Sequence, residues 1–91
     1  MTGLQMITEK FRTNVDHKGY DAAHDDAHTK GELVDAVLCY LAYSQRLMPP
    51  ELWPFEADAW KQSDDPIRNL VRAGALIAAE IDRLERARNR P

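Results

Sequence analysis

Apolar residues recur at intervals of three and four positions along three parts of the chain, with polar residues between them. This spacing places the apolar side chains on one face of an α-helix. The pattern therefore predicts an all-α fold without a sheet. We expect a three-helix compact domain, in which the helices occupy residues 4–17, 30–47 and 66–88 and a long aromatic loop joins the second helix to the third.

The predicted helix ends carry residues that commonly start or stop a helix. Gly19 follows the first helix, where glycine readily adopts left-handed backbone. Thr29 and Glu32 form a T-x-x-E capping box before the second helix, and two consecutive prolines follow its last turn. Pro66 suits the first position of the third helix, with Asp65 among the candidate N-caps. These signals support the three predicted ranges.

The third predicted helix carries a heptad-like apolar seam that Gly74 interrupts. A glycine inside a helix costs about 1 kcal/mol relative to alanine, so we expect a close helix–helix crossing there. A single domain of 91 residues buries only about two-thirds of its unfolded surface, which favours self-association. We predict a homo-oligomer that buries Leu70, Gly74, Ile77 and Ile81. The charged tail, about 85–91, is expected to fray.

Composition narrows the classes of partner and location. The formal net charge is −3, and 30% of the residues are charged without a polybasic face, so binding to duplex nucleic acid is not expected. No apolar run reaches the roughly 20 residues that span a bilayer. The first residues lack the basic and apolar regions of a secretory signal. A soluble cytoplasmic protein is therefore predicted.

A set of motifs covers most of the chain. These are G-Y-x3-H-D-D-x-H-x2-G-E-L at 19–33, W-P-F at 53–55, W-K at 60–61 and R-N-L-V-R-A-G-A-L-I-x-A-E-I-x-R-L at 68–84. In order and spacing they resemble a family of small phage and prophage proteins. The resemblance implies a mobile-element setting in the cytoplasm of a bacterial host, where small proteins often serve in counter-defence. It implies little about chemistry.

Two of the three histidines and four carboxylates lie within residues 19–33. Imidazole nitrogens and carboxylate oxygens are suitable ligands for zinc, manganese or iron. If this segment is helical, His24 and His28 share a face and could hold a divalent metal ion together with Asp25 and Glu32. The alternative is structural, because such side chains also cap helices and bond loop amides. Both interpretations stay open.

Aromatic and basic residues form two further candidate groups. Trp53 and Trp60, in the predicted loop, either pack over the helix ends or offer a platform for a ring. Arg68 and Arg72 are spaced i,i+4 near the start of the third helix, where they could receive a phosphate or carboxylate. The alternative for the arginines is pairing with nearby acidic residues. Tyr20, beside the histidine cluster, completes the candidate binding surface.

Two polar residues among apolar neighbours have structural interpretations. Glu80 is expected to pair with Arg83 or with an arginine of another subunit. Cys39 lies mid-helix, where burial would raise the pKa of its thiol and leave it inert. No catalytic residue is assigned from the sequence.

The function predicted first is a non-catalytic accessory protein that binds a small anionic, nucleotide-like ligand or a host protein. The alternative is a small metal-dependent nucleotide phosphohydrolase, with a divalent ion as its cofactor. The residues expected to bind the ligand are Tyr20, His24, Asp25, His28, Trp53, Trp60, Arg68 and Arg72, and those expected to bind the metal are His24, Asp25, His28 and Glu32.

Overall fold

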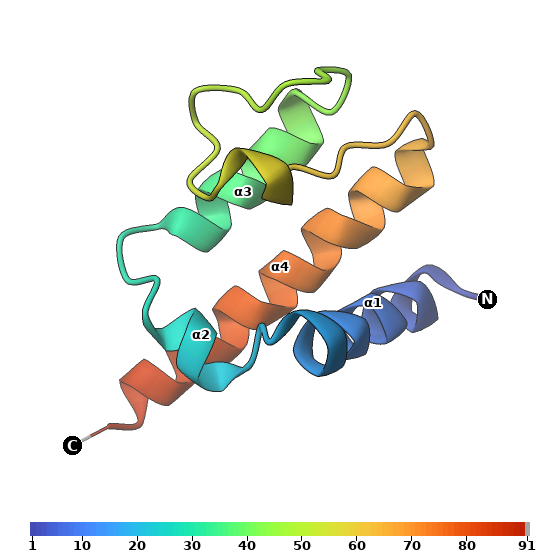
Figure 1. Ribbon diagram of the computed structural model, residues 1–91. Coiled ribbons are helices and arrows are strands. Elements are labelled where there is room, and N and C mark those ends of the chain that lie inside the picture. The colour runs from blue at the N-terminus through green and yellow to red at the C-terminus, as the bar shows by residue number, and fades with distance from the viewer. Residues whose placement is uncertain (91) are drawn as a thin grey trace.

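The computed structural model describes residues 1–90 and has an all-α fold, with no strand in that range (Figure 1). This confirms the predicted fold class. The predicted count of three helices is wrong, because one short helix forms between the first two. Five residues are too few to show a repeating apolar spacing. The helices are α1 (Gly3–Lys18), α2 (Ala22–Asp26), α3 (Glu32–Ala42) and α4 (Pro66–Arg88), with a 3-10 turn η1 (Ala57–Ala59) between the last two.

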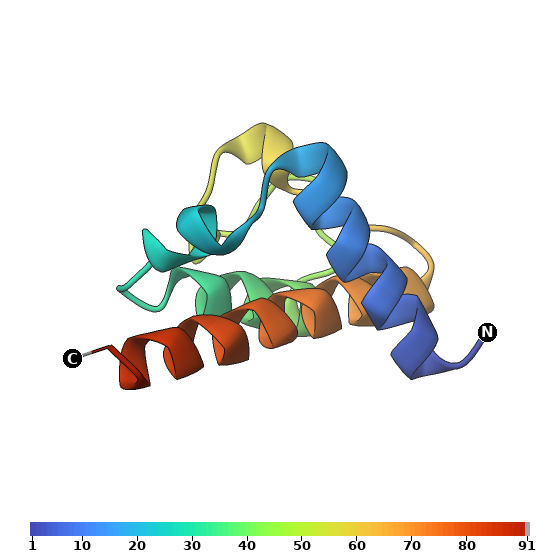
Figure 2. The same cartoon turned by 90° about the horizontal axis from the view of Figure 1, so that it is seen from below.

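The long helix α4 is the centre of the molecule, and α1, α2 and α3 all pack against it. Figures 1 and 2 show α3 beside α4, with α1 crossing α4 nearer its start. In Figure 2, α2 and η1 lie on the same side of the α3–α4 pair. Small side chains line the buried face of α4 and permit this close packing, namely Ala73, Ala75 and Ala79.

The crossing of α1 over α4 explains the glycine in the middle of α4. A Cβ atom built on Gly74 would lie 2.5 Å from Cδ1 of Ile7. The close crossing expected at this glycine is therefore made within the chain, by α1. At its other end α1 stops as predicted, with Gly19 in left-handed backbone at a φ of 71°.

Helix α3 is shorter than the predicted range 30–47, and the predicted Thr29 cap is wrong. Gly31, at a φ of 84°, is the N-cap residue, and no side chain caps this helix end. Glu32 does reach back, but its Oε1 accepts the backbone N–H of Lys30 at 2.6 Å. At the other end, the carbonyl of Arg46 accepts the indole N–H of Trp60 at 2.9 Å, a tertiary contact that sequence spacing does not reveal.

Helix α4 occupies the predicted range and begins as predicted. The side chain of Asp65 accepts the backbone N–H of Ile67, and Pro66 takes the first position. The tail expected to fray from about residue 85 is instead helical to Arg88. Arg86 and Arg90 both pair with Asp26 of α2, at 2.9 and 2.7 Å. Pro91 lies outside the described residues.

The core lies between α3, α4 and the segment 43–65. Its buried members include Val37, Tyr40, Trp60 and Ala73, with Trp53 and Leu76 packed against them. Cys39 is fully buried, and this burial together with nearby Asp35 raises the pKa of its thiol, as expected for an inert cysteine.

Glu80 pairs with Arg83 on the same helix, which is one of the two expected partners. None of the helices within residues 1–90 combines the length and apolar content needed to cross a membrane.

Candidate ligand-binding cavity

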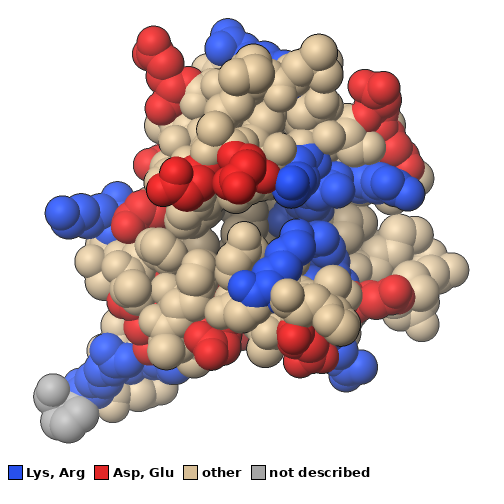
Figure 3. Space-filling model, viewed as in Figure 1, with Lys and Arg blue, Asp and Glu red and all other residues tan. Residues whose placement is uncertain are grey.

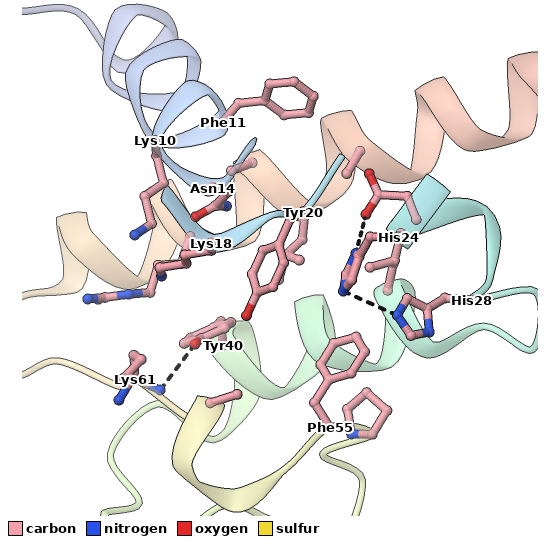
Figure 4. Close-up of a pocket in the computed structure, with 18 of the residues that line it drawn as sticks. Lys10, Phe11, Asn14, Lys18, Tyr20, His24, His28, Tyr40, Phe55 and Lys61 are labelled. Carbon is pink, nitrogen blue, oxygen red and sulfur yellow. Dashed lines mark hydrogen bonds and ion pairs between the residues drawn. The ribbon is translucent and has the colours of Figure 1, made fainter. Parts of the chain in front are cut away.

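A cavity of about 610 Å³ opens between α1, α2, α3, α4 and the segment 43–65. This volume lies within the range of small-molecule sites. Figure 3 shows a hollow in this face of the molecule, with Lys and Arg side chains on one side of it and Asp and Glu on the other. The close-up in Figure 4 shows two distinct ends, with Lys10 and Lys18 at one, His24 and His28 at the other, and Tyr20 between.

We call Lys10, Asn14, Lys18 and Arg72 the basic end of the cavity, since all four line it. The first three come from α1 at intervals of four residues, which places them on one face of that helix. Arg72 comes from α4, two residues before the glycine at which α1 crosses. The crossing therefore brings cations from two helices together.

The charges at the basic end repel one another. The pKa of Lys10 is lowered to about 8, first because burial desolvates its ammonium group, and then because Lys18 contacts it and Arg72 lies near. Within residues 1–90, neither these two lysines nor Arg72 forms an ion pair. No carboxylate of the described residues therefore pairs directly with these cations, although Glu56 and Asp58 also line the cavity and Lys18 lies over the ring of Tyr20.

Some hydrogen-bonding groups at the basic end also lack a partner among the described residues. The Nε and Nη1 atoms of Arg72 are buried, and no atom within the described part of the chain accepts a hydrogen bond from them. We call these two groups the open donors. Asn14 is buried, and its Oδ1 has no donor among residues 1–90. Buried polar groups in folded proteins are nearly always bonded, so both residues carry hydrogen-bonding capacity that the fold itself does not use.

Aromatic rings form a continuous wall that begins in the core, reaches the two histidines at one end of the cavity and ends at Tyr20. Centroid distances between neighbouring rings range from 4.6 to 5.6 Å, and the pairs are stacked or edge-to-face. Tyr40 lies near the basic end, where burial raises the pKa of its phenol and its oxygen accepts the backbone N–H of Lys61. In order, the rings are Trp60, Tyr40, Trp53, Phe55, His28, His24 and Tyr20.

At the opposite end of the cavity, which we call the imidazole end, each histidine is oriented by a neighbouring carboxylate. Nδ1 of His24 lies 3.0 Å from Oδ1 of buried Asp25, and Nδ1 of His28 lies 3.4 Å from Oε2 of Glu32. The two Nε2 atoms face each other at 3.4 Å. Asp21 starts α2 by accepting the backbone N–H of His24, and this cap positions the first imidazole.

The four predicted metal ligands therefore form a line of contacts, in the order Asp25, His24, His28 and Glu32. Each carboxylate is bonded to the outer nitrogen of an imidazole, which fixes the orientation of the ring. Within the described 90 residues, no group of three or more His, Cys, Asp or Glu side chains is arranged to hold a metal ion. The groups at this end that remain available to bind a cation are the two facing Nε2 atoms.

The structure brings six of the eight predicted ligand-binding residues to the cavity, namely Tyr20, His24, Asp25, His28, Trp53 and Arg72. The other two lie elsewhere. Trp60 is buried in the core, stacked on Tyr40 at 4.8 Å, which is the packing interpretation. Arg68 is exposed and lines a neighbouring depression beside Met1 and Met6, which shares Lys10 and Arg72 with the cavity.

Sequence analysis missed three members of the basic end, which are Lys10, Asn14 and Lys18. Their spacing of four was visible, but lysines spaced in this way usually mark the solvated face of a helix.

Comparison with known protein families, with characterised proteins and with solved structures finds no match for this chain. The resemblance to small phage and prophage proteins therefore stays a prediction. The function has to be argued from the geometry of the cavity alone.

Proposed function

We propose that this protein binds a small anionic ligand with a planar ring, of the nucleotide kind, in the cavity. The observation that carries the proposal is the pair of open donors on Arg72, beside Lys10 and Lys18. A buried donor without an acceptor costs about 1–3 kcal/mol, and more when it is charged. A phosphate or carboxylate accepts such hydrogen bonds and neutralises the repelling cations.

The remainder of the cavity fits the other parts of such a ligand. Tyr20 and Phe55 line it with partly exposed rings on which a planar base can stack. The open oxygen of Asn14 can accept a hydrogen bond from a hydroxyl or amino group. In this arrangement the anion lies at the basic end and the ring extends along the aromatic wall.

Calorimetric titration with a panel of nucleoside monophosphates, the matching nucleosides and inorganic phosphate tests the proposal. We expect the monophosphates to bind more tightly than the nucleosides. Arg72→Gln should weaken binding, whereas Arg68→Gln, one turn earlier on the same helix but outside the cavity, should leave it unchanged. Equal affinity for nucleosides and monophosphates would contradict an anion site.

A metal-dependent nucleotide phosphohydrolase is the second candidate, and the facing Nε2 atoms of His24 and His28 favour it. Each imidazole is oriented by a carboxylate, as histidine ligands of metals commonly are. The line of contacts leaves a metal with two protein nitrogens, fewer than the three protein ligands of typical catalytic zinc sites. Metal content of the purified protein and turnover of nucleotides with added zinc or manganese decide between the candidates.

We also propose that the chain forms a homo-oligomer through the outer faces of α3 and α4. Three of the four residues predicted for this interface are exposed, namely Leu70 at 59%, Ile77 at 44% and Ile81 at 55%. Exposed Val34, Leu38 and Leu41 on α3 add to the apolar surface. The fourth, Gly74, faces Ile7 of α1 and is not part of this surface.

Light scattering on the wild type and on Ile81→Glu tests the assembly. We expect an oligomer that the charged variant dissociates, because a glutamate in an apolar interface loses its hydration without a partner. A wild-type monomer at tens of micromolar, where weak specific dimers assemble, would contradict it. A host-protein partner and a role in counter-defence stay predictions of the phage resemblance.

A further inference from the structure

Lys10 differs from the other lysines of the chain in its surroundings. The sequence contains four lysines, of which Lys10, Lys18 and Lys61 line the cavity and Lys30 does not. Lys10 alone among them combines partial burial, contact with a second lysine and proximity to an arginine. A lysine that is desolvated beside another cation is the arrangement that activates an amine as a nucleophile.

We propose that Lys10 is a nucleophile that forms an imine with an anionic carbonyl compound, an oxo acid or a phosphorylated aldehyde, bound in the cavity. The proposal rests on the proposed function in one respect, since the open donors of Arg72 would hold the anionic group of this compound. It goes further by naming the substrate class and the reacting atom. The carbonyl carbon would lie within reach of Nζ of Lys10.

The reaction balances with groups already at the basic end. The free amine of Lys10 attacks the carbonyl carbon, and the carbonyl oxygen takes up a proton to give a carbinolamine. The hydroxyl group of the carbinolamine then leaves as water, and a carbon–nitrogen double bond remains. Overall, both hydrogens of this water come from the amine. Lys18, which lies beside Lys10 at the basic end, would donate the proton that the departing oxygen takes up.

The free amine is available at neutral pH. With a pKa of about 8, Lys10 is uncharged at pH 7 on the order of a hundred times more often than an ordinary lysine. The anion of the carbonyl compound would be held by Arg72 and Lys18, so that Lys10 is left to react as the free amine.

Reductive trapping tests the proposal on the whole protein. The protein is incubated with a low concentration of pyridoxal 5′-phosphate, treated with borohydride, which reduces the imine to a stable amine, and mapped by mass spectrometry. We expect Lys10 to be labelled at least about tenfold faster than exposed Lys30, given its larger free-amine fraction. Inorganic phosphate should slow the labelling of Lys10 but not of Lys30. Lys30→Arg should leave the labelling of Lys10 unchanged, whereas Lys10→Arg should abolish the fast phase.

Two analogues separate failure of this inference from failure of the proposed function. Pyridoxine 5′-phosphate has the ring and phosphate without the aldehyde, and pyridoxal has the aldehyde without the phosphate. Calorimetric binding of pyridoxine 5′-phosphate with no selective labelling of Lys10 would overturn the imine and support the anion site. Equal labelling rates with pyridoxal and its phosphate would support the nucleophile and overturn the anchoring role of Arg72. Labelling of Lys10 no faster than Lys30, with no binding of either analogue, would overturn both.

Discussion

The two ends of the cavity contain similar numbers of polar side chains but use them in opposite ways. At the imidazole end, Nδ1 of His24 is bonded to Asp25, Nδ1 of His28 is bonded to Glu32, and the two Nε2 atoms lie 3.4 Å apart. At the basic end, the open donors of Arg72 and the Oδ1 of Asn14 have no partner within residues 1–90. One end therefore finds carboxylate partners within the folded chain, and the other leaves polar atoms without a partner among the described residues.

This difference is informative because density of polar residues is not what marks a binding site. The imidazole end is the more conspicuous in sequence, with two histidines and four carboxylates close together. Its contacts stabilise the fold whether or not a ligand is present. The residues of the basic end are dispersed along the sequence, but its cations form no ion pair and its open donors have no acceptor within residues 1–90. The predictions below test this difference between the two ends.

The largest expected effect is on binding at the basic end. Arg72→Gln should weaken the affinity for a nucleoside monophosphate about ten- to a hundredfold, because a charge-assisted hydrogen bond contributes about 1.5–3 kcal/mol. The melting temperature should stay level or rise, since the substitution removes a half-buried charge, two of whose nitrogens are buried without an acceptor. Titration calorimetry and thermal unfolding measure the two effects. A variant that unfolds earlier but binds normally would make Arg72 a structural residue.

The next effect is on the pH dependence of binding. Lys10 has a pKa of about 8, so it loses its charge as the pH rises through that value and the affinity for an anion should fall, by roughly tenfold or less. Lys10→Arg should remove this inflection, because arginine stays charged. Lys30→Gln is the matched control and should retain it. A flat profile in the wild type would show that Lys10 does not face the anion.

The lowered pKa of Lys10 also determines how the stability of the folded chain changes with pH. The folded chain binds the Lys10 proton less tightly than the unfolded chain, whose lysine has the ordinary value of 10.5. The cost of the charged Lys10 is therefore fully present below about pH 8. It diminishes as the pH rises from there toward 10.5, so this residue makes the protein more stable over that interval.

Much of the fold could be predicted from local signals. The bounds of α4 follow from Asp65 and Pro66 at its start, and Gly19 marks the end of α1, since these residues act through their own backbone preferences. The early end of α3 could not be predicted, because it accompanies a hydrogen bond between Trp60 and Arg46, fourteen residues apart. The spacing of apolar residues along the chain predicts local structure, but it does not predict contacts between distant segments.

The candidate site divides in the same way. The imidazole end could be predicted because His24, His28 and Glu32 are each four residues apart, so their contacts are local. The basic end could not, because Lys10 and Arg72 come from helices whose crossing is set by Ile7 against Gly74. Arg68 and Arg72 look equivalent in sequence. Only the packing of α1 places one in the cavity and the other outside it.

A smaller effect is expected at the imidazole end. His28→Ala should lower the free energy of unfolding by about 1 kcal/mol, or several degrees in melting temperature, because it breaks two contacts of the line. Anion affinity should change little, as this end lies away from the lysines of the basic end (Figure 4). Both quantities are measured on the one variant. A stable His28→Ala protein that no longer binds the ligand would reverse the assignment of the two ends.

The smallest effect concerns the attachment of the imidazole end to α4. Arg86 and Arg90 of the C-terminal part pair with Asp26, and the hydrogen bonds from Arg86 lower the pKa of that carboxyl group. Asp26→Asn should lower the melting temperature slightly at neutral pH, since these pairs reach the solvent and are weakened by salt. Because a carboxyl group with a lowered pKa stabilises the fold only when ionised, the wild type loses this advantage as the pH falls below 3.8, and the two proteins should then unfold together. Glu85→Gln, which removes an exposed pair with Arg88 on the same helix, is the control and should show no such convergence. If Asp26→Asn weakened anion binding as well, the orientation of α2 would have to matter at the basic end, and the two ends would not be independent.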